Sequence, residues 1–102
     1  MNITILTPDK QVFKGEIVSV KVPGTMGQFQ VLNNHAPIVS SLEAGKVHIV
    51  TAAGEHEVYN ESTGDIEVEN EAGKTITFSI EAGFIEVLKN EIALLVQGVS
   101  FS

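Results

Sequence analysis

The most regular pattern in the chain is a six-residue run, Thr75-Ile76-Thr77-Phe78-Ser79-Ile80. Its large apolar residues occupy every second position, and hydroxyl residues occupy the positions between them. Because successive side chains of a strand leave opposite faces, a half-buried β-strand requires this period of two. The run therefore predicts a strand with one face on a core and the other toward solvent.

The same alternation predicts strands over residues 16–22 and 45–51. Their predicted core-directed residues are Val18, Val20 and Val22 in the first, and Val47 and Ile49 in the second. Turn residues separate such runs at intervals of about ten residues, at Thr7-Pro8-Asp9, Pro23-Gly24, Asn33-Asn34, Ala44-Gly45, Ala53-Gly54, Thr63-Gly64, Ala72-Gly73 and Lys89-Asn90. No segment carries the helical i, i+3, i+4, i+7 pattern over ten residues, and a strand is favoured over a helical turn at residues 36–43. The chain is predicted to be all-β, a sandwich or a barrel.

Two segments depart from simple alternation. Residues 92–96 are apolar on both faces, so this strand is predicted to be central in its sheet or covered by a partner. Residues 65–71 alternate strictly, with an acid at every odd position: Asp65, Glu67, Glu69 and Glu71. Carboxylates in a row repel one another and retain their water, so this face is predicted to be exposed to solvent.

Length and charge restrict the classes of protein that fit. The 102 residues are predicted to form a single domain, residues 1–102. Thirteen acids face six lysines and no arginine, giving a net charge of −7. A basic face for nucleic acid is therefore not expected. No apolar run approaches a membrane span, and no signal peptide is visible.

Few residues fit catalysis or cofactor binding. Cysteine is absent, and no Gly-x-Ser-x-Gly elbow surrounds a serine. The three histidines lack the paired spacing of a zinc helix; we expect His48 on the surface and His56 solvated at a hairpin edge. The two glycines at positions 24 and 27 match neither a Walker loop nor a dinucleotide fingerprint, and they predict a turn that needs positive φ. We predict no enzyme activity, no metal, no cofactor and no small-molecule substrate.

Four motifs, in order, resemble the epsilon subunit of F-type ATP synthases. The longest is Val20-Lys21-Val22-Pro23-Gly24-Thr25-Met26-Gly27-Gln28-Phe29-Gln30-Val31-Leu32-Asn33-Asn34-His35-Ala36-Pro37. The others are Leu6-Thr7-Pro8-Asp9 with Val12-Phe13, Leu42-Glu43-Ala44-Gly45-Lys46-Val47, and Ala82-Gly83-Phe84-Ile85-Glu86-Val87. The resemblance covers nearly the whole chain except an acidic stretch, residues 53–74, which is longer than the corresponding hairpin of most members.

The resemblance implies a flattened, ten-stranded antiparallel β-sandwich that serves as a central-stalk (rotor) subunit. Such a subunit couples rotation of the gamma subunit to the membrane c-ring during proton-driven ATP synthesis. The implied c-ring contact is the turn of Gly24, Thr25, Met26, Gly27 and Gln28. The implied gamma contact is His35, Ala36 and Pro37, although His35 could instead be a turn residue bonded to the local backbone. The implied location is peripheral, on the cytoplasmic side of the bacterial plasma membrane.

One departure from the family limits what the resemblance implies. Typical members continue into two α-helices associated with ATP binding and with braking ATP hydrolysis, and this chain ends where that helical hairpin would begin. Those two functions are therefore not expected here. The alternative from another class is a stand-alone β-sandwich binding module for protein or carbohydrate, which predicts an exposed aromatic patch. Five Phe, one Tyr and no Trp supply little for it.

Overall fold

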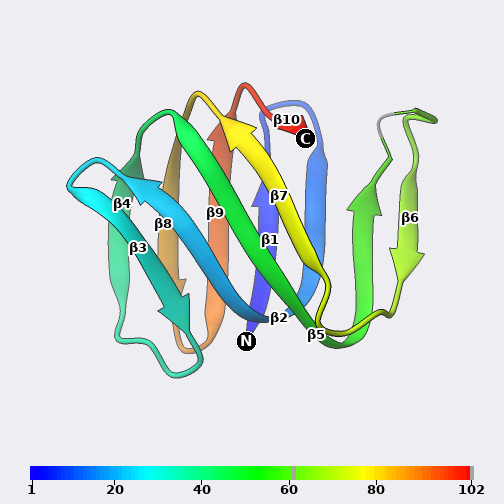
Figure 1. The fold of residues 1–102 in the computed structure, drawn as a ribbon, viewed down its shortest axis with the longest axis horizontal. Coiled ribbons are helices and arrows are strands. Elements are labelled where there is room, and N and C mark those ends of the chain that lie inside the picture. Colours follow the sequence, from blue (N-terminus) through cyan, green and yellow to red (C-terminus); the bar gives the residue numbers. More distant parts are fainter. Residues whose placement is uncertain (61, 102) are drawn as a thin grey trace.

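A computed structural model describes residues 1–60 and 62–101 of the chain. The described residues form strands and turns without a helix (Figure 1). The strands are β1 (Asn2–Leu6), β2 (Gln11–Gly24), β3 (Gly27–Leu32), β4 (Ile38–Leu42), β5 (Gly45–Tyr59), β6 (Ile66–Glu69), β7 (Thr75–Ile80), β8 (Ala82–Leu88), β9 (Glu91–Gln97) and β10 (Ser100–Phe101). The ten-stranded sandwich expected from the sequence is confirmed, and so is the strand at residues 75–80.

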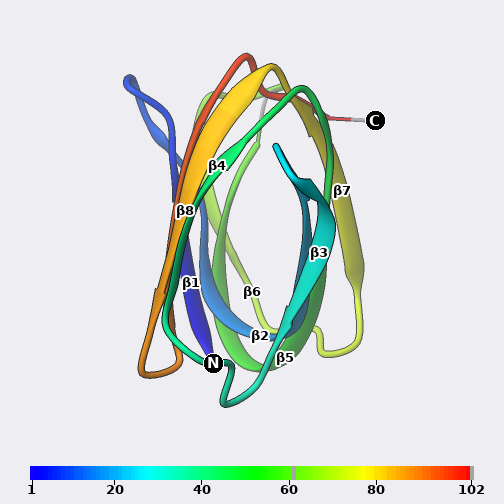
Figure 2. The same cartoon turned by 90° about the vertical axis from the view of Figure 1, so that its left-hand side faces the viewer.

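The strands form two layers, which Figure 2 shows edge-on. The wide layer has the order β4-β8-β9-β1, then the first part of β2, the last part of β5, and β6. The narrow layer contains β3, the rest of β2, the first part of β5, β7 and β10. All of these pairs are antiparallel, as expected, except β1 with β9, which is parallel and is the one departure from the expected antiparallel arrangement. The molecule is flat, with principal extents of 35 × 27 × 20 Å.

Two long strands join the layers because each bends from one layer into the other. The register of β2 against β5 slips between Gly15 and Ile17, where four residues of β5 face one residue of β2. Gly54 lies within this bend with φ of 123°, a conformation that glycine adopts without strain. The turn expected at Ala53-Gly54 is therefore wrong: the chain bends there, and it reverses only beyond Tyr59.

Apolar side chains from both layers meet in one core. It includes the predicted inward residues Val20, Val22, Val47, Ile49, Phe78 and Ile80. Val18 was expected among them, but it is 52% exposed. A second register slip, between Ile17 and Ser19, explains the difference, because a bulge turns the following side chains to the other face.

His56 is the second residue whose predicted exposure is wrong. Its side chain is only 1% exposed rather than solvated. Its Nε2 atom lies 3.0 Å from the Glu16 carbonyl oxygen, to which it donates a hydrogen bond. Its ring stacks on Phe13 with centroids 5.8 Å apart. The bend at Gly54 carries His56 past the hairpin edge into the core, opposite Gly15, which has no side chain.

Strand β9 bears out one of the two alternatives that its apolar sequence left open, a central place in its sheet, while cover by a partner stays a prediction. It lies between β1 and β8, so it is central in the wide layer. Ile92, Leu94 and Val96 are buried on its inner face. Leu95, on its outer face, is 47% exposed. The outer face of the wide layer is therefore left partly apolar and uncovered by the described residues.

Candidate functional site

The turn expected to meet the c-ring projects from one end of the molecule (Figure 1). Gly24 and Gly27 are paired at the ends of β2 and β3, and Thr25 and Met26 form the tip between them. Gly27 has φ of 124°, which meets the expected need for positive φ at one of the two glycines. Gly24 is required for another reason: a Cβ there would lie 2.7 Å from the Gly27 carbonyl oxygen. The tip is consequently tight and well defined.

Met26 is the most exposed apolar side chain of the described part of the chain. It is 100% exposed, and Gln28 beside it is also exposed. The backbone N–H of Thr25 donates to the Ser41 carbonyl oxygen at 3.1 Å, which ties the turn to β4. A fully exposed methionine contributes nothing to the core, so folding does not explain this residue.

The segment expected near the gamma subunit follows the other end of β3. The Nδ1 atom of His35 lies 2.6 Å from the Ala36 carbonyl oxygen, so the half-buried ring is held to the backbone of the next residue. Ala36 and Pro37 are exposed. His35 is therefore a turn residue bonded to the local backbone, which is one of its two expected roles. A gamma contact of His35, Ala36 and Pro37 stays a prediction.

A clasp between two turns holds this segment in place. The backbone N–H of Asn34 donates to Oδ1 of Asn90 at 2.8 Å, and Nδ2 of Asn90 donates back to Oδ1 of Asn34 at 3.2 Å. Both residues have positive φ, 65° and 62°, which asparagine tolerates better than most residues. The β3–β4 turn is thereby fastened to the β8–β9 turn, 56 residues further along the chain.

The structure does not bring the two predicted contact segments together. They lie at opposite ends of the six-residue strand β3, about 20 Å apart at the usual rise per residue. A partner at the Met26 turn and a partner at the His35 segment would therefore approach the sandwich from different ends.

Sequence reasoning missed a shallow groove on the outer face of the wide layer. Its apolar floor consists of Leu6, Phe84 and Leu95, which belong to β1, β8 and β9. Register places these three side chains in one row, because Leu6 pairs with Leu95 and Leu95 with Phe84. The groove measures about 480 Å³. The sequence indicates an apolar outer face for residues 92–96, because Ala93 and Leu95 are apolar. Only strand pairing shows that Leu6 and Phe84 lie beside Leu95.

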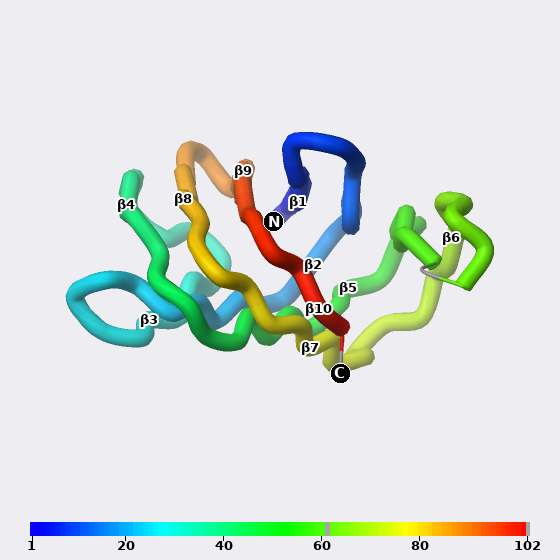
Figure 3. Tube along the Cα trace, turned by 90° about the horizontal axis from the view of Figure 1, so that it is seen from above, coloured from blue at the N-terminus to red at the C-terminus, as the bar shows by residue number. Residues whose placement is uncertain are grey.

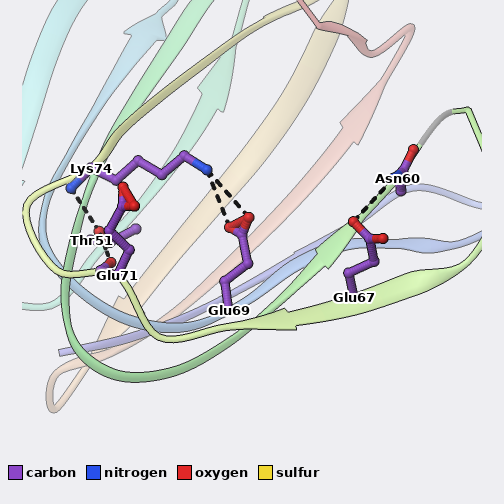
Figure 4. Close-up of polar contacts among 6 residues, drawn as sticks. All are labelled: Thr51, Asn60, Glu67, Glu69, Glu71 and Lys74. Atoms are coloured by element: carbon purple, nitrogen blue, oxygen red, sulfur yellow. Dashed lines mark hydrogen bonds and ion pairs between the residues drawn. The ribbon is translucent and has the colours of Figure 1, made fainter.

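The acidic stretch forms a hairpin, and the segment that follows β6, residues 71–74, is hydrogen-bonded to Thr51 of β5 (Figure 4). The buried hydroxyl of Thr51 donates to the Glu71 carbonyl oxygen at 2.7 Å and accepts the Lys74 backbone N–H at 2.9 Å. Nζ of Lys74 also lies 3.2 Å from the Glu69 carboxylate. Asp65, Glu67 and Glu71 are exposed as expected, and Glu69 is half-buried.

Neither a metal cluster nor a membrane helix is found in the described residues. Within residues 1–60 and 62–101, no three His, Asp or Glu side chains are grouped to hold an ion. In the same ranges, no helix has the length and apolar content that crossing a membrane requires.

Comparison with known proteins identifies the family. The family described as "ATP synthase, Delta/Epsilon chain, beta-sandwich domain" matches residues 1–72 of the chain. The chain belongs to this family. An ATP synthase epsilon chain of Chlorobium limicola is 34% identical over 98 residues, which cover 96% of this chain and 90% of the relative. A second, of Chlorobaculum tepidum, is 37% identical with the same coverage.

Other relatives are longer. The chain spans about three fifths of the epsilon chain of Dichelobacter nodosus (35% identical, 87% of this chain, 61% of the relative). Among solved structures, a chain of the Euglena gracilis mitochondrial ATP synthase matches with a TM-score of 0.71 at 19% identity, covering 97% of this chain and 51% of that one. A chain of the Tetrahymena thermophila mitochondrial ATP synthase central stalk and c-ring matches with a TM-score of 0.69 at 19% identity, covering 99% and 66%. These two structures support the fold.

Proposed function

We propose that this epsilon-family chain is a non-catalytic rotor subunit of an F-type ATP synthase. In this role it links rotation of the gamma subunit to the c-ring. The observation that carries the proposal is family membership together with 90% coverage of a relative named as an epsilon chain. The physical task is to transmit torque, which requires a stiff body. A single core closed by strands that run through both layers suits that task.

The Met26 turn is the proposed c-ring contact. It combines a fully exposed apolar side chain with a tip held tightly by Gly24 and Gly27. Because the backbone of the tip is already held, only the side chain has to be ordered when a partner covers it. Gln28, neutral and exposed, supplies an amide that can donate and accept hydrogen bonds at the rim of the contact.

The gamma subunit is proposed to cover two places on the wide layer. The first is the segment His35, Ala36 and Pro37, which the Asn34–Asn90 clasp holds still. The second is the groove of Leu6, Phe84 and Leu95, since apolar rows of this kind are stabilised when a partner removes them from water. Both features lie along the wide layer, so one partner can reach both.

The proposed location follows from the assembly. The chain would be peripheral to the membrane and held there through the c-ring, on the cytoplasmic side of a bacterial plasma membrane. The chain itself needs no membrane-spanning segment for this location.

Co-purification from the native membrane tests the proposal. An affinity-tagged chain should bring gamma and the catalytic subunits out of detergent-solubilised membranes, and mass spectrometry identifies them. Replacing two groove residues, Phe84→Ser and Leu95→Ser, should reduce gamma recovery while the domain stays folded. Val18→Ser, an exposed apolar position on the other layer, is the matched control. Absence of gamma with the unaltered chain would contradict the rotor role.

A further inference from the structure

The net charge of the chain is concentrated in one hairpin. Residues 53–74 contain seven of the thirteen acids and one of the six lysines. This segment therefore carries −6 of the formal charge of −7, and the other residues together carry −1. In the described part of the chain, Lys74 is the only ammonium group within ion-pair distance of a hairpin carboxylate. The field around the hairpin is therefore strongly negative.

Strand β6 of this hairpin has one open edge. It pairs with β5 along one side, and the described residues place no strand on its other side. Seen from above, β6 lies at the end of the wide layer opposite to β4 (Figure 3). An edge strand presents backbone N–H and C=O groups that another strand can bond.

The two faces of β6 differ in chemistry, and both are accessible. Ile66 and Val68 lie on the outer face, opposite Tyr59 and Glu57 of β5, and they are 44% and 64% exposed. Glu67 and Glu69 lie on the inner face, opposite Val58 and His56. Glu67 is nevertheless exposed. Among the described residues, Ile66 and Val68 belong neither to the hydrophobic core nor to the partly buried residues packed against it.

These observations restrict the kind of strand that could pair with β6. A second copy of β6 would place carboxylates against carboxylates, which is destabilising in cross-strand pairs. A strand that alternates basic and apolar residues places lysine or arginine beside Glu67 and Glu69. The same strand places its apolar residues beside Ile66 and Val68. Its pattern complements both faces at once.

We propose that the free edge of β6 is a docking site for an extended protein segment that alternates basic and apolar residues. The segment adds as a further strand of the wide layer, so that main-chain hydrogen bonds and alternate side chains act together. This site is separate from the Met26 turn and the groove. The proposal does not require the rotor role, because its test uses the chain alone.

A synthetic peptide tests the proposal directly. The probe is a short, end-blocked peptide in which lysine alternates with valine, and its binding to the full chain is followed by NMR. Saturable shifts should centre on the amides of residues 66–69, and the β6 amides not bonded to β5 should become protected from hydrogen exchange. Higher ionic strength should weaken binding. A peptide of the same composition in scrambled order should bind about tenfold more weakly.

Methylated peptides separate strand pairing from simple charge attraction. Two versions of the probe carry N-methyl groups on alternate residues, one version on the odd and the other on the even residues. Only one set of amides points at β6 in an added strand, so one version should lose binding and the other should keep more of it. Equal binding of both versions, or of the scrambled peptide, would overturn the proposal.

Variants of the chain complete the test. Glu67→Gln with Glu69→Gln, and separately Ile66→Ser with Val68→Ser, should each raise the Kd about tenfold. The matched control is Val18→Ser with Leu32→Ser, two exposed apolar residues elsewhere, which should leave the Kd unchanged. Unchanged binding by both hairpin variants, or self-association of the chain through β6, would overturn the proposal.

Discussion

The imidazole of His56 occupies the space that a side chain at Gly15 would need. The two residues are register partners on β5 and β2, and a Cβ built at Gly15 would lie 2.6 Å from Cδ2 of His56. The same ring bonds the Glu16 carbonyl, which lies in the slipped part of the ladder. A glycine and a histidine 41 residues apart thus form the corner at which both long strands change layer.

Replacing Gly15 should destabilise this corner. Gly15→Ala should lower the free energy of unfolding by about 2 kcal/mol, because the added methyl group displaces the ring or the β5 backbone. Urea denaturation followed by circular dichroism measures the change. Ser100→Ala, at an exposed position, is the control and should change the free energy by less than about 0.5 kcal/mol. A neutral Gly15→Ala would mean that the corner has room to relax.

Removing the donor of His56 should be costly even when the ring shape is kept. His56→Phe preserves an aromatic ring against Phe13 but leaves the Glu16 carbonyl without its partner. The expected loss is about 1–3 kcal/mol of unfolding free energy, the cost of an unsatisfied buried acceptor. Thermal and urea unfolding of both proteins checks this value. Equal stability would show that solvent satisfies the carbonyl.

The hydroxyl of Thr51 should hold residues 71–74, which follow the acidic hairpin, in a fixed conformation. Thr51→Val keeps the buried volume but removes the group that bonds Glu71 and Lys74. We expect faster hydrogen exchange at the Lys74 amide and about 1–3 kcal/mol lower stability. Thr51→Ser, which retains the hydroxyl, should keep the exchange protection. If serine and valine behaved alike, the methyl group rather than the hydroxyl would matter.

Neutralising the acidic face should hardly affect folding. In Glu67→Gln with Glu69→Gln, the pair lost with Lys74 is a partly exposed one on the surface. The expected change in stability is within about 0.5 kcal/mol. Co-purification of gamma should also be unchanged, because this face is remote from the proposed rotor contacts. Loss of gamma with the double variant would place the acidic face in that interface.

Charges at the exposed turn should impair coupling without unfolding the domain. Met26→Asp with Gln28→Lys alters two exposed side chains, so the melting temperature should not change. In a c-ring contact, a buried charge without a partner costs about 3–5 kcal/mol, so ATP-driven proton pumping in reconstituted vesicles should fall.

The control for this experiment changes a different exposed turn. Ser62→Lys adds one charge at the tip of the acidic hairpin and should leave pumping unchanged. Normal pumping by an assembled Met26→Asp, Gln28→Lys variant would remove this turn from the interface.

The chain's own alternation and turn residues determined most of the strands. Residues 45–51 and 75–80 form strands because a period of two puts apolar side chains on one face, whatever the neighbouring strand is. The exposed turn at Met26 was also predictable, since its flanking glycines mark a tight reversal. These features depend on backbone sterics within a few residues, which the sequence expresses directly.

Only the tertiary structure decided which way certain side chains face. Val18 is exposed and His56 is buried because bulges between β2 and β5 shift the register, and those bulges depend on pairing between distant segments. The groove of Leu6, Phe84 and Leu95 likewise exists because three strands pair in one register. A one-residue slip moves a side chain to the opposite face, and local sequence does not specify where the slip occurs.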